Sequence, residues 1–380
     1  MQKRQKKQIK VIISGGKTGG HLFPGIATAQ ALQKLNPDTC LLFVGTDAPF
    51  EIKTLEKYGF DHKAITSKPV KSGNIVSKLW SASLVLISLI QSMMIIRKFK
   101  ADFVLGVGSF SSFAVVLAAR IMGVPSAIQE QNAFPGLTNR LLMRFCNTVF
   151  TAFEKTQGWI GNPKIKYVGN PVRESAYSDD DPDNNLYNEL SDRKFSQESD
   201  ENKITILVTG GSQGAASINS AFPEAISLIK DKEKLNIIHQ SGINNEPALR
   251  QKYADMKIKA KVKAFFHDMP QIQKSADLAV TRAGASTIAE LCVHGLPAVL
   301  VPYPYAANDH QTHNAKALED AGAAAMIQDR ELKPEKLKQI LEELIKNKEK
   351  RAAMTKALKK MAKTDAAETI AHHILNSVSS

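Results

Sequence analysis

Residues 9–21 read IKVIISGGKTGGH, and the same pattern returns in residues 203–214, which read KITILVTGGSQG. In both stretches a short apolar run rich in β-branched residues ends at a glycine pair, and a helical pattern follows. Such a run is typical of a buried parallel strand that turns directly into a helix. The repeat predicts two Rossmann-like α/β domains, with ligands bound in a central cleft at the carboxyl ends of the two sheets.

Strand and helix patterns continue to alternate along the chain and indicate domain boundaries. We expect strands at 40–44, 101–107, 126–129 and 148–152 and helices at 23–35 and 114–122. Residues 178–202 hold nine acidic and two basic residues, which is typical of a solvated linker or surface insertion. The expected parts are therefore an N-terminal domain over 1–176, an acidic linker over 177–203, a C-terminal domain over 204–362, and a C-terminal helix over 363–380, for which a return to the first domain stays open.

Length, charge and cysteine content exclude several classes of protein. A chain of 380 residues with 43% hydrophobic residues can bury two cores, unlike a disordered tail or a disulfide-stapled miniprotein. Residues 1–176 carry 23 basic and 9 acidic side chains, whereas residues 177–380 carry 27 and 28. This excess predicts an anionic partner for the first domain, either nucleic acid or a membrane surface. The three cysteines form no CxxC pair, which favours a reducing, cytoplasmic compartment.

Residues 79–96 form an uncharged run of 18 residues, diluted by five polar side chains. Its length is at the lower edge of what a transmembrane helix needs. Three interpretations stay open: a spanning helix, a buried helix, and a helix with one face against lipid. In the third, Lys68, Lys71 and Lys78 would lie beside anionic headgroups, so that residues 68–98 would meet an anionic membrane surface.

The first glycine turn, residues 15–20, matches neither standard phosphate-binding motif. A P-loop ending in Lys17 and Thr18 needs glycine where this chain has Val11, and the glycine spacing is wrong for a dinucleotide fingerprint. A glycine turn before a helix still presents amide N–H groups to an anion or a sugar hydroxyl. His21 follows at the helix start, where the helix dipole disfavours its protonation, so it is either a neutral general base or a helix cap.

Two segments of the second domain have both a structural and a functional interpretation. Residues 210–214 are either a tight packing turn or a second anion cradle with Ser212 supplying a hydroxyl. Residues 280–290 read VTRAGASTIAE and join a strand end to a helix start. There Thr287 and Glu290 have the spacing of a capping box; functionally, the amides at 285–287 would face a diphosphate and Glu290 would accept both hydroxyls of a ribose.

Two polar loops, residues 129–132 and 302–314, carry amide and imidazole side chains suited to sugar hydroxyls. We interpret none of these motifs as a metal site, and we expect neither a metal nor another cofactor. Helix termini with Arg173 or Arg282 would instead hold a nucleotide diphosphate. Aromatic residues are not interleaved with the basic ones, so we do not expect nucleic acid as a partner.

Seven motifs, spanning roughly residues 9–326, resemble in their order the MurG family of glycosyltransferases. They are GGKTGGHLFPGIATAQAL, GVGSFSSF, QEQNAFPGLTNRLL, GNPVR, VTGGSQGAASIN, TRAGASTIAELCVHGLPAVLVPYP and NDHQTHNA. The resemblance implies a two-domain GT-B fold and an inverting, metal-independent transfer of N-acetylglucosamine (GlcNAc) from UDP-GlcNAc to the C4 hydroxyl of MurNAc in lipid I. The product would be lipid II for peptidoglycan synthesis, and the enzyme would be peripheral on the cytoplasmic face of the cell membrane.

The same resemblance implies the site residues. His21 matches the residue suspected as the general base. The UDP-GlcNAc donor would be surrounded by Thr18, Gly19, Gly20, Asn132, Arg173, Ser212, the backbone of Phe266, Ala285, Ser286, Thr287, Ile288, Ala289, Glu290 and Gln311. The chain departs from the family where Lys17, Ser109 and Phe113 replace glycines and Gln129 replaces a histidine, which affects the acceptor side more than the donor side.

Three other functions are compatible with parts of this pattern. A related GT-B enzyme could glycosylate another lipid, although the sequences QEQN and PGLTN argue against it. A UDP-sugar epimerase or a non-catalytic UDP-sugar binder would share the fold but would not need residues 79–96 beside a basic surface. A nucleic-acid binder would explain the charge and would show a steep salt dependence of DNA affinity.

Overall fold

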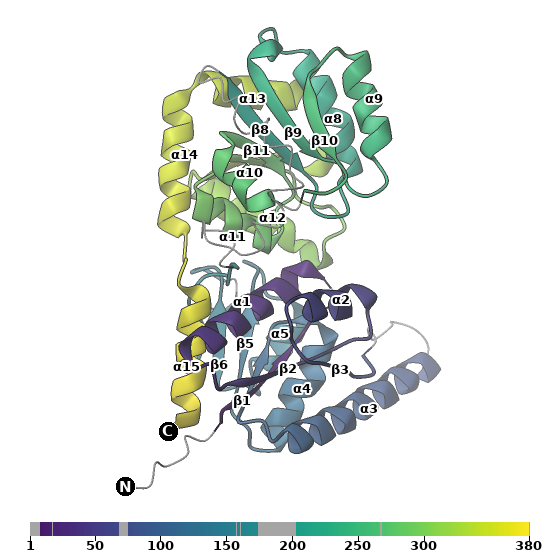
Figure 1. Cartoon of the computed structure of the whole chain (residues 1–380), viewed down its shortest axis with the longest axis vertical. Helices are drawn as coiled ribbons and strands as arrows, with labels where there is room; N and C mark the ends of the chain where they lie inside the picture. The colour runs from purple at the N-terminus through teal and green to yellow at the C-terminus, as the bar shows by residue number, and fades with distance from the viewer. Residues whose placement is uncertain are drawn as a thin grey trace. The chain divides into compact units, whose positions relative to one another are not determined.

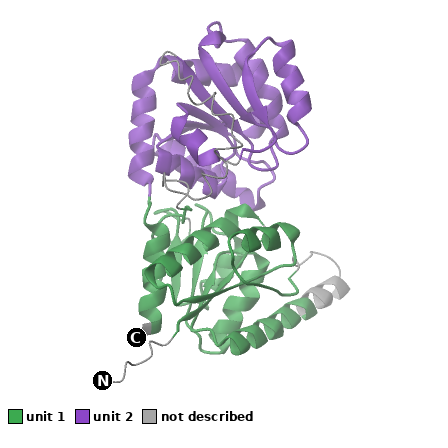
Figure 2. Cartoon of the chain, viewed as in Figure 1, with its two compact units in different colours: residues 1–173, 363–380 green, residues 174–362 purple. Residues whose placement is uncertain are grey.

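The computed structural model describes residues 8–16, 18–67, 75–156, 158–159, 161–173, 203–266 and 268–379, without the side chains of residues 75–82 and 379. The acidic segment 178–202 and residues Lys17, Lys68 and Lys71 lie outside this description, as does the side chain of Lys78. The chain divides into two compact units (Figure 2). The first comprises residues 1–173 with 363–380, and the second comprises residues 174–362.

The first unit is built on a seven-stranded parallel sheet with the order β3-β2-β1-β4-β5-β6-β7 (Figure 1). Its strands are β1 (Lys10–Ser14), β2 (Cys40–Gly45), β3 (His62–Ala64), β4 (Phe103–Gly106), β5 (Ser126–Glu130), β6 (Thr148–Thr151) and β7 (Ile165–Tyr167). Its helices are α1 (Gly19–Leu35), α2 (Pro49–Lys57), α3 (Ile75–Phe99), α4 (Ser109–Ile121), α5 (Leu137–Leu142) and α15 (Ala366–Ser379).

The second unit is built on a six-stranded parallel sheet with the order β10-β9-β8-β11-β12-β13. Its strands are β8 (Ile204–Thr209), β9 (Leu235–Gln240), β10 (Ala260–Lys263), β11 (Leu278–Thr281), β12 (Ala298–Leu300) and β13 (Ala324–Met326). Its α-helices are α8 (Ala216–Ser227), α9 (Glu246–Asp255), α10 (Met269–Ser275), α11 (Ala285–His294), α12 (His310–Asp320), α13 (Pro334–Lys346) and α14 (Lys348–Met361), with short 3₁₀ turns η2 (Lys232–Lys234), η3 (Ala307–Asp309) and η4 (Asp329–Glu331).

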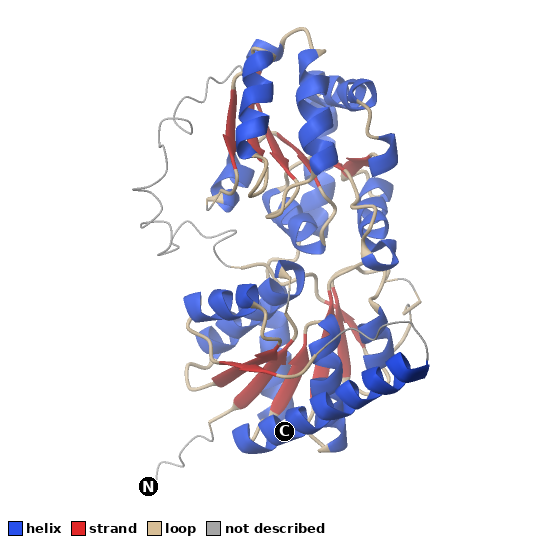
Figure 3. Cartoon of the chain, turned by 90° about the vertical axis from the view of Figure 1, so that its right-hand side faces the viewer, coloured by secondary structure: helices blue, strands red, loops and turns tan. Residues whose placement is uncertain are grey.

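The prediction of two parallel α/β domains is confirmed, and within each unit helices cover both faces of the sheet (Figure 3). The apolar runs that predicted strands are the buried ones: Val11, Ile12 and Ile13 of β1 are fully buried, as are Ile206 and Val208 of β8. Strands covered on both faces read as continuous apolar runs rather than alternating ones.

Two expected helix starts were wrong. The first helix begins at Gly19 rather than at residue 23, and Pro24 lies inside it. The fourth begins at Ser109 rather than at residue 114. Glycine and serine have low helix propensity, so the sequence pattern hides a first turn built from them. The correction matters for the site, because it places His21 within the first turn of α1.

Helix α15 packs on α1 in the first unit, although it follows α14 of the second unit in sequence. Ile370 and Ile374 are fully buried in the core that α1 also lines. His373 lies edge-on to the ring of Phe150 and its Nε2 is 3.1 Å from Thr148 Oγ1. The last helix is therefore a structural part of the N-terminal unit.

Candidate functional site

The expected site residues lie at one edge of each sheet. In the first unit, the segments after β1, β4, β5 and β7 all follow carboxyl ends of parallel strands. In the second unit the same holds for Ser212, Phe266, Ala285 and Gln311, which follow β8, β10, β11 and β12. Because parallel strands share their direction, these segments gather at the edge where open α/β sheets bind ligands.

His21 and Gln131 meet in the first unit. His21 is the third residue of α1, and its Nδ1 lies 3.1 Å from Gln131 Oε1. Gln131 follows β5 and is 1% exposed, so its side chain is not available to bind sugar hydroxyls, contrary to the expectation. Thr18 and Gly20 are exposed, and Thr18 makes no side-chain cap to α1. Of the two interpretations of His21, this contact favours an oriented imidazole over a helix cap.

Glu130 organises the loop that carries Asn132. One carboxylate oxygen accepts hydrogen bonds from the backbone N and from Nδ2 of Asn132, at 2.9 and 3.0 Å. The other accepts from Gly136 N and Asn139 Nδ2, at 3.0 and 2.8 Å. Four donors hold this buried carboxylate, so Glu130 is a structural anchor and Asn132 is presented in a fixed orientation.

Arg173 lies against α1. Its guanidinium stacks over the ring of Phe23, 4.3 Å from the centroid, and Nη1 donates to the Tyr58 hydroxyl at 3.0 Å. Stacking on an aromatic face leaves the edge of a guanidinium able to bind an anion. Arg173 therefore remains a candidate for the donor diphosphate.

The second glycine turn is tightly packed. A Cβ on Gly214 would come 2.1 Å from Ser241 O, and one on Gly210 would come 2.2 Å from Ala215 N. Both positions therefore require glycine for close backbone approach. Ser212 is exposed in the middle of this turn, and α8 begins four residues later at Ala216. The packing interpretation thus accounts for the glycines, while the Ser212 hydroxyl remains available to a ligand.

Gln240 connects this turn to Phe266, a link that the sequence analysis missed. Its Oε1 accepts from the backbone N of Phe266 at 2.9 Å, and its Nε2 donates to Gly211 O at 3.1 Å and Thr209 Oγ1 at 3.2 Å. The backbone of Phe266 was expected to contact the UDP-GlcNAc donor. Its N–H is already satisfied by Gln240, so the Phe266 carbonyl is the remaining backbone group of this residue for the donor to contact.

The expected capping box in α11 is wrong. The N-cap of α11 is Gly284, so Thr287 lies in the first turn instead of capping it. A glycine cap supplies no side-chain acceptor, and the N–H groups of Ala285, Ser286 and Thr287 are those that an α-helix leaves without intrahelical acceptors. Ser286 Oγ is buried and has no hydrogen-bond partner among the described residues. Glu290, one turn on, accepts from Gln273 Nε2 at 3.1 Å.

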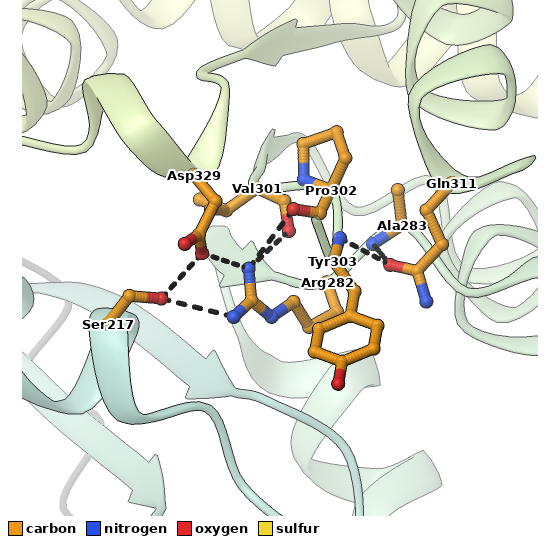
Figure 4. Close-up of polar contacts among 8 residues, drawn as sticks. All are labelled: Ser217, Arg282, Ala283, Val301, Pro302, Tyr303, Gln311 and Asp329. Atoms are coloured by element: carbon orange, nitrogen blue, oxygen red, sulfur yellow. Dashed lines mark hydrogen bonds and ion pairs between the residues drawn. The ribbon is translucent and has the colours of Figure 1, made fainter. Parts of the chain in front are cut away.

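Arg282 is not placed to hold a diphosphate, contrary to expectation. Its Nη1 forms an ion pair with Asp329 and donates to the carbonyls of Val301 and Pro302, while Nη2 donates to Ser217 Oγ at 3.0 Å (Figure 4). The Arg282 side chain is 12% exposed. Its donors therefore connect η4, α8 and the end of β12 inside the second unit.

Gln311 bridges two neighbouring loops in the same region (Figure 4). Its Oε1 accepts hydrogen bonds from the backbone N of Ala283 at 3.2 Å and of Tyr303 at 3.0 Å. Because the oxygen is occupied twice, the side-chain amide presents N–H donors to a ligand. Gln311 thereby joins the loop before α11, which begins with Ala285, to the loop after β12.

Three further titratable groups, His239, Cys146 and Cys292, are buried. His239 is fully buried between Tyr253 and Asn219, and burial lowers its pKa to about 3. Burial also raises the pKa of the Cys146 and Cys292 thiols, to about 11 and 12. Within the described part of the chain, no group of three or more His, Cys, Asp or Glu residues is arranged to hold a metal ion.

Comparisons with known proteins identify the family. The model of the glycosyltransferase family 28 N-terminal domain matches residues 11–151, and that of the C-terminal domain matches residues 205–370. Two similar relatives, from Myxococcus xanthus and Geotalea uraniireducens, are named UDP-N-acetylglucosamine--N-acetylmuramyl-(pentapeptide) pyrophosphoryl-undecaprenol N-acetylglucosamine transferase. They are 39% and 40% identical over 96% and 95% of this chain, and over 91% and 96% of their own lengths.

Solved structures agree with this result. The crystal structure of Acinetobacter baumannii MurG matches with a TM-score of 0.78 and 29% identity, over 97% of this chain and 99% of that one. A UDP-GlcNAc 2-epimerase from Neisseria meningitidis matches with a TM-score of 0.69 but 15% identity, over 97% and 100%, and so shares only the fold. The chain therefore has the GT-B fold and belongs to glycosyltransferase family 28, within the MurG family of N-acetylglucosamine transferases.

Proposed function

We propose that this chain transfers GlcNAc from UDP-GlcNAc to the C4 hydroxyl of the MurNAc sugar of lipid I, giving lipid II and UDP. The observation that carries the proposal is close identity, over nearly the whole chain, to transferases whose name states this donor and this acceptor. An epimerase is not favoured, because the likeness to epimerase structures is limited to the fold.

The second unit is the proposed donor site. The N–H groups of Ala285, Ser286 and Thr287 lie at the positive end of the α11 dipole, where a diphosphate is stabilised. The buried Ser286 hydroxyl, which has no partner within the described residues, supplies a further donor there. Glu290 would accept the ribose hydroxyls. Further proposed donor contacts come from Ser212, Phe266, Ile288, Ala289 and Gln311.

His21 of the first unit is the proposed general base. The C4 oxygen of the acceptor attacks the anomeric carbon of GlcNAc, the bond from that carbon to UDP breaks, and the acceptor proton passes to His21. Direct displacement inverts the anomeric configuration. Amides of α11 and the Ser212 hydroxyl would stabilise the charge on departing UDP, an electrostatic effect worth several kcal/mol without a metal ion. Thr18, Gly19, Gly20, Asn132 and Arg173 would complete the donor contacts.

Helix α3 is the proposed membrane-binding element. Leu86, Ile90 and Met94 repeat every four residues and are 56%, 49% and 58% exposed, so they form one apolar face. Two of its polar residues, Ser88 and Ser92, are buried on the opposite side. None of the described helices is long and apolar enough to span a bilayer.

The surroundings of this face suit an anionic bilayer. The last turn of α3 carries Arg97 and Lys98. Leu137 and Leu141 of α5, which like α3 contacts α4, are also exposed, at 55% and 44%, and Arg140 lies between them in sequence. An apolar face flanked by cations is typical of a helix that lies in the membrane interface. The enzyme would thus be peripheral on the cytoplasmic face of the membrane, where lipid I would be its acceptor.

The test is a transfer assay with the full chain, UDP-GlcNAc labelled in the sugar, and a lipid I analogue, in buffer with either EDTA or magnesium. The proposal predicts a labelled lipid II analogue at equal rates in both buffers. Transfer to a diacylglycerol but not to lipid I would overturn the acceptor assignment. Activity lost in EDTA and restored by magnesium would overturn the metal-independent mechanism.

A further inference from the structure

We infer that Gln131 is a positioning residue that fixes the proton of His21 on Nδ1, so that the basic lone pair is on Nε2. Three buried amide side chains and one backbone carbonyl carry this inference. It rests on the proposed function, in which His21 is the general base. It adds which nitrogen of the ring accepts the proton and which neighbouring groups determine this.

The orientation of the Gln131 amide follows from its surroundings. Nε2 donates to the carbonyl of Val107 at 2.7 Å and to the side-chain oxygen of Gln129. Oε1 points to His21 Nδ1 at 3.1 Å. A backbone carbonyl can only accept hydrogen bonds, so the nitrogen end of the amide must face Val107. The oxygen end must then face His21.

The protonation of His21 follows in turn. An amide oxygen only accepts, so a hydrogen bond to it requires the proton to be on Nδ1 of the ring. In the neutral imidazole the other nitrogen then holds the lone pair. The carbonyl of Val107, at the end of β4, therefore determines through Gln131 which nitrogen of a residue on α1 can take a proton.

Two further amides fix Gln131 from behind. Gln129 is fully buried, and its Nε2 donates to Asn170 Oδ1 at 3.1 Å. Asn170 is 6% exposed, and its Nδ2 has no hydrogen-bond partner among the described residues. The hydrogen bonds run in one series, from His21 to Gln131, Gln129 and Asn170. Each amide accepts through its oxygen on the His21 side and has its nitrogen on the other side, so each bond polarises the next.

This relay contains no ionisable group. A carboxylate in the place of Gln131 would favour the imidazolium and raise the pKa of His21. The nearby carboxylate of Glu130 is instead occupied by the donors of Asn132, Gly136 and Asn139. Gln131 thus orients His21 without placing a negative charge on Nδ1.

Gly108 provides the space for this arrangement. It directly follows Val107, has a φ of +100°, and a Cβ built on it would lie 2.6 Å from His21 Nδ1. A side chain at this position would displace the imidazole from Gln131. The end of β4 therefore supplies both the carbonyl that orients the amide and the gap that admits the ring.

The direct test is nitrogen NMR of the full chain with ¹⁵N-labelled histidine, with the His21 signals assigned by their loss in His21→Ala. We expect neutral His21 to be protonated on Nδ1 in the wild type. Methionine has a similar length to glutamine but no amide. In Gln131→Met we therefore expect neutral His21 to be protonated on Nε2, or to be a mixture of the Nδ1–H and Nε2–H tautomers. Nε2–H in the wild type, or unchanged Nδ1–H in folded Gln131→Met, would overturn the inference. This readout needs no activity, so it is independent of the proposed function.

Kinetics give the second test. Gln131→Met should lower kcat on the order of 100-fold, the scale of a general base, with KM for UDP-GlcNAc within about twofold. Gln131→Glu should move the acidic limb of kcat/KM to higher pH by about one unit. If Gln131→Met fails to fold, Gln131→Leu, which also removes the amide, takes its place with the same expected directions. If the wild type is active and the folded variant has the same kcat, the inference is contradicted. If the wild type shows no transfer activity, only the proposed function is contradicted.

Discussion

The side-chain oxygen of Gln311 accepts a hydrogen bond from the backbone N–H of Ala283, and a second from Tyr303. The oxygen is thus occupied within the protein, and the NH₂ group is what the side chain would offer to the proposed donor sugar. Gln311→Glu keeps the acceptor and removes that donor. We expect KM for UDP-GlcNAc to rise about tenfold, the loss of one hydrogen bond of about 1.4 kcal/mol.

Steady-state kinetics at varied UDP-GlcNAc concentration measure this effect. Gln339→Glu, on the exposed side of α13, is the matched control and should leave KM unchanged. An unchanged KM in Gln311→Glu would remove Gln311 from the donor site.

The ion pair of Arg282 with Asp329 stabilises the second unit. Both side chains are largely buried, at 12% and 20% exposed, and Arg282 also donates to Ser217 and to two carbonyls. Asp329→Ala leaves the guanidinium without its counter-charge, so we expect the free energy of unfolding to fall by about 2–4 kcal/mol. Urea denaturation measures it.

An exposed pair provides the control for that experiment. Lys316 and Asp320 form an ion pair on α12 whose side chains are 60% and 64% exposed. Asp320→Ala should change the free energy of unfolding by less than about 0.5 kcal/mol. Equal effects of the two substitutions would show that the Arg282 network does not stabilise the unit.

His239 predicts a loss of stability at acidic pH. Burial lowers its folded-state pKa to about 3 from the ordinary value of 6.5, so the unfolded chain binds the extra proton between these values. Stability from this group is therefore complete above pH 6.5 and is lost as the pH falls towards 3. At pH 5 the loss is about 2 kcal/mol, which urea denaturation at pH 7.5 and pH 5 should detect.

In His239→Gln the free energy of unfolding should differ less between pH 7.5 and pH 5, because the titrating group is gone. The exposed His372 is the control, and His372→Gln should keep the wild-type dependence. If the free energy of unfolding of His239→Gln falls between pH 7.5 and pH 5 as much as that of the wild type, His239 is not the group responsible.

The apolar face of α3 predicts membrane binding. Leu86→Ser combined with Met94→Ser removes two exposed apolar side chains, and we expect at least tenfold weaker binding to vesicles of phosphatidylglycerol and phosphatidylethanolamine. Vesicle sedimentation measures it. Leu228→Ser, at a 45% exposed position of the second unit, should bind as the wild type does. Equal binding by all three proteins would exclude α3 as the membrane contact.

Both sheets were predictable from the sequence because their central strands are short β-branched runs that end in glycine. The helix starts at Gly19 and Ser109 were not predictable, since the first turns consist of poor helix formers that tertiary packing stabilises. Thr287 and Glu290 have a capping-box spacing, but the helix begins at a glycine cap three residues earlier than that spacing requires.

The candidate site was predictable in composition but not in its internal connections. Arg282 looked available for a diphosphate because its partner Asp329 lies 47 residues later in the chain. Gln131 was expected to bind sugar hydroxyls. Its burial and orientation depend on a hydrogen bond to Val107, 24 residues away, which the local sequence does not show. Such long-range hydrogen bonds leave no local pattern in the sequence.

The position of uridine tests the central claim most directly. A crystal structure of the chain with UDP should show the nucleotide on the unit of residues 174–362, with its diphosphate at the N-terminus of α11 and its ribose hydroxyls on Glu290. Uridine bound to the first unit, or away from Glu290, would contradict the account.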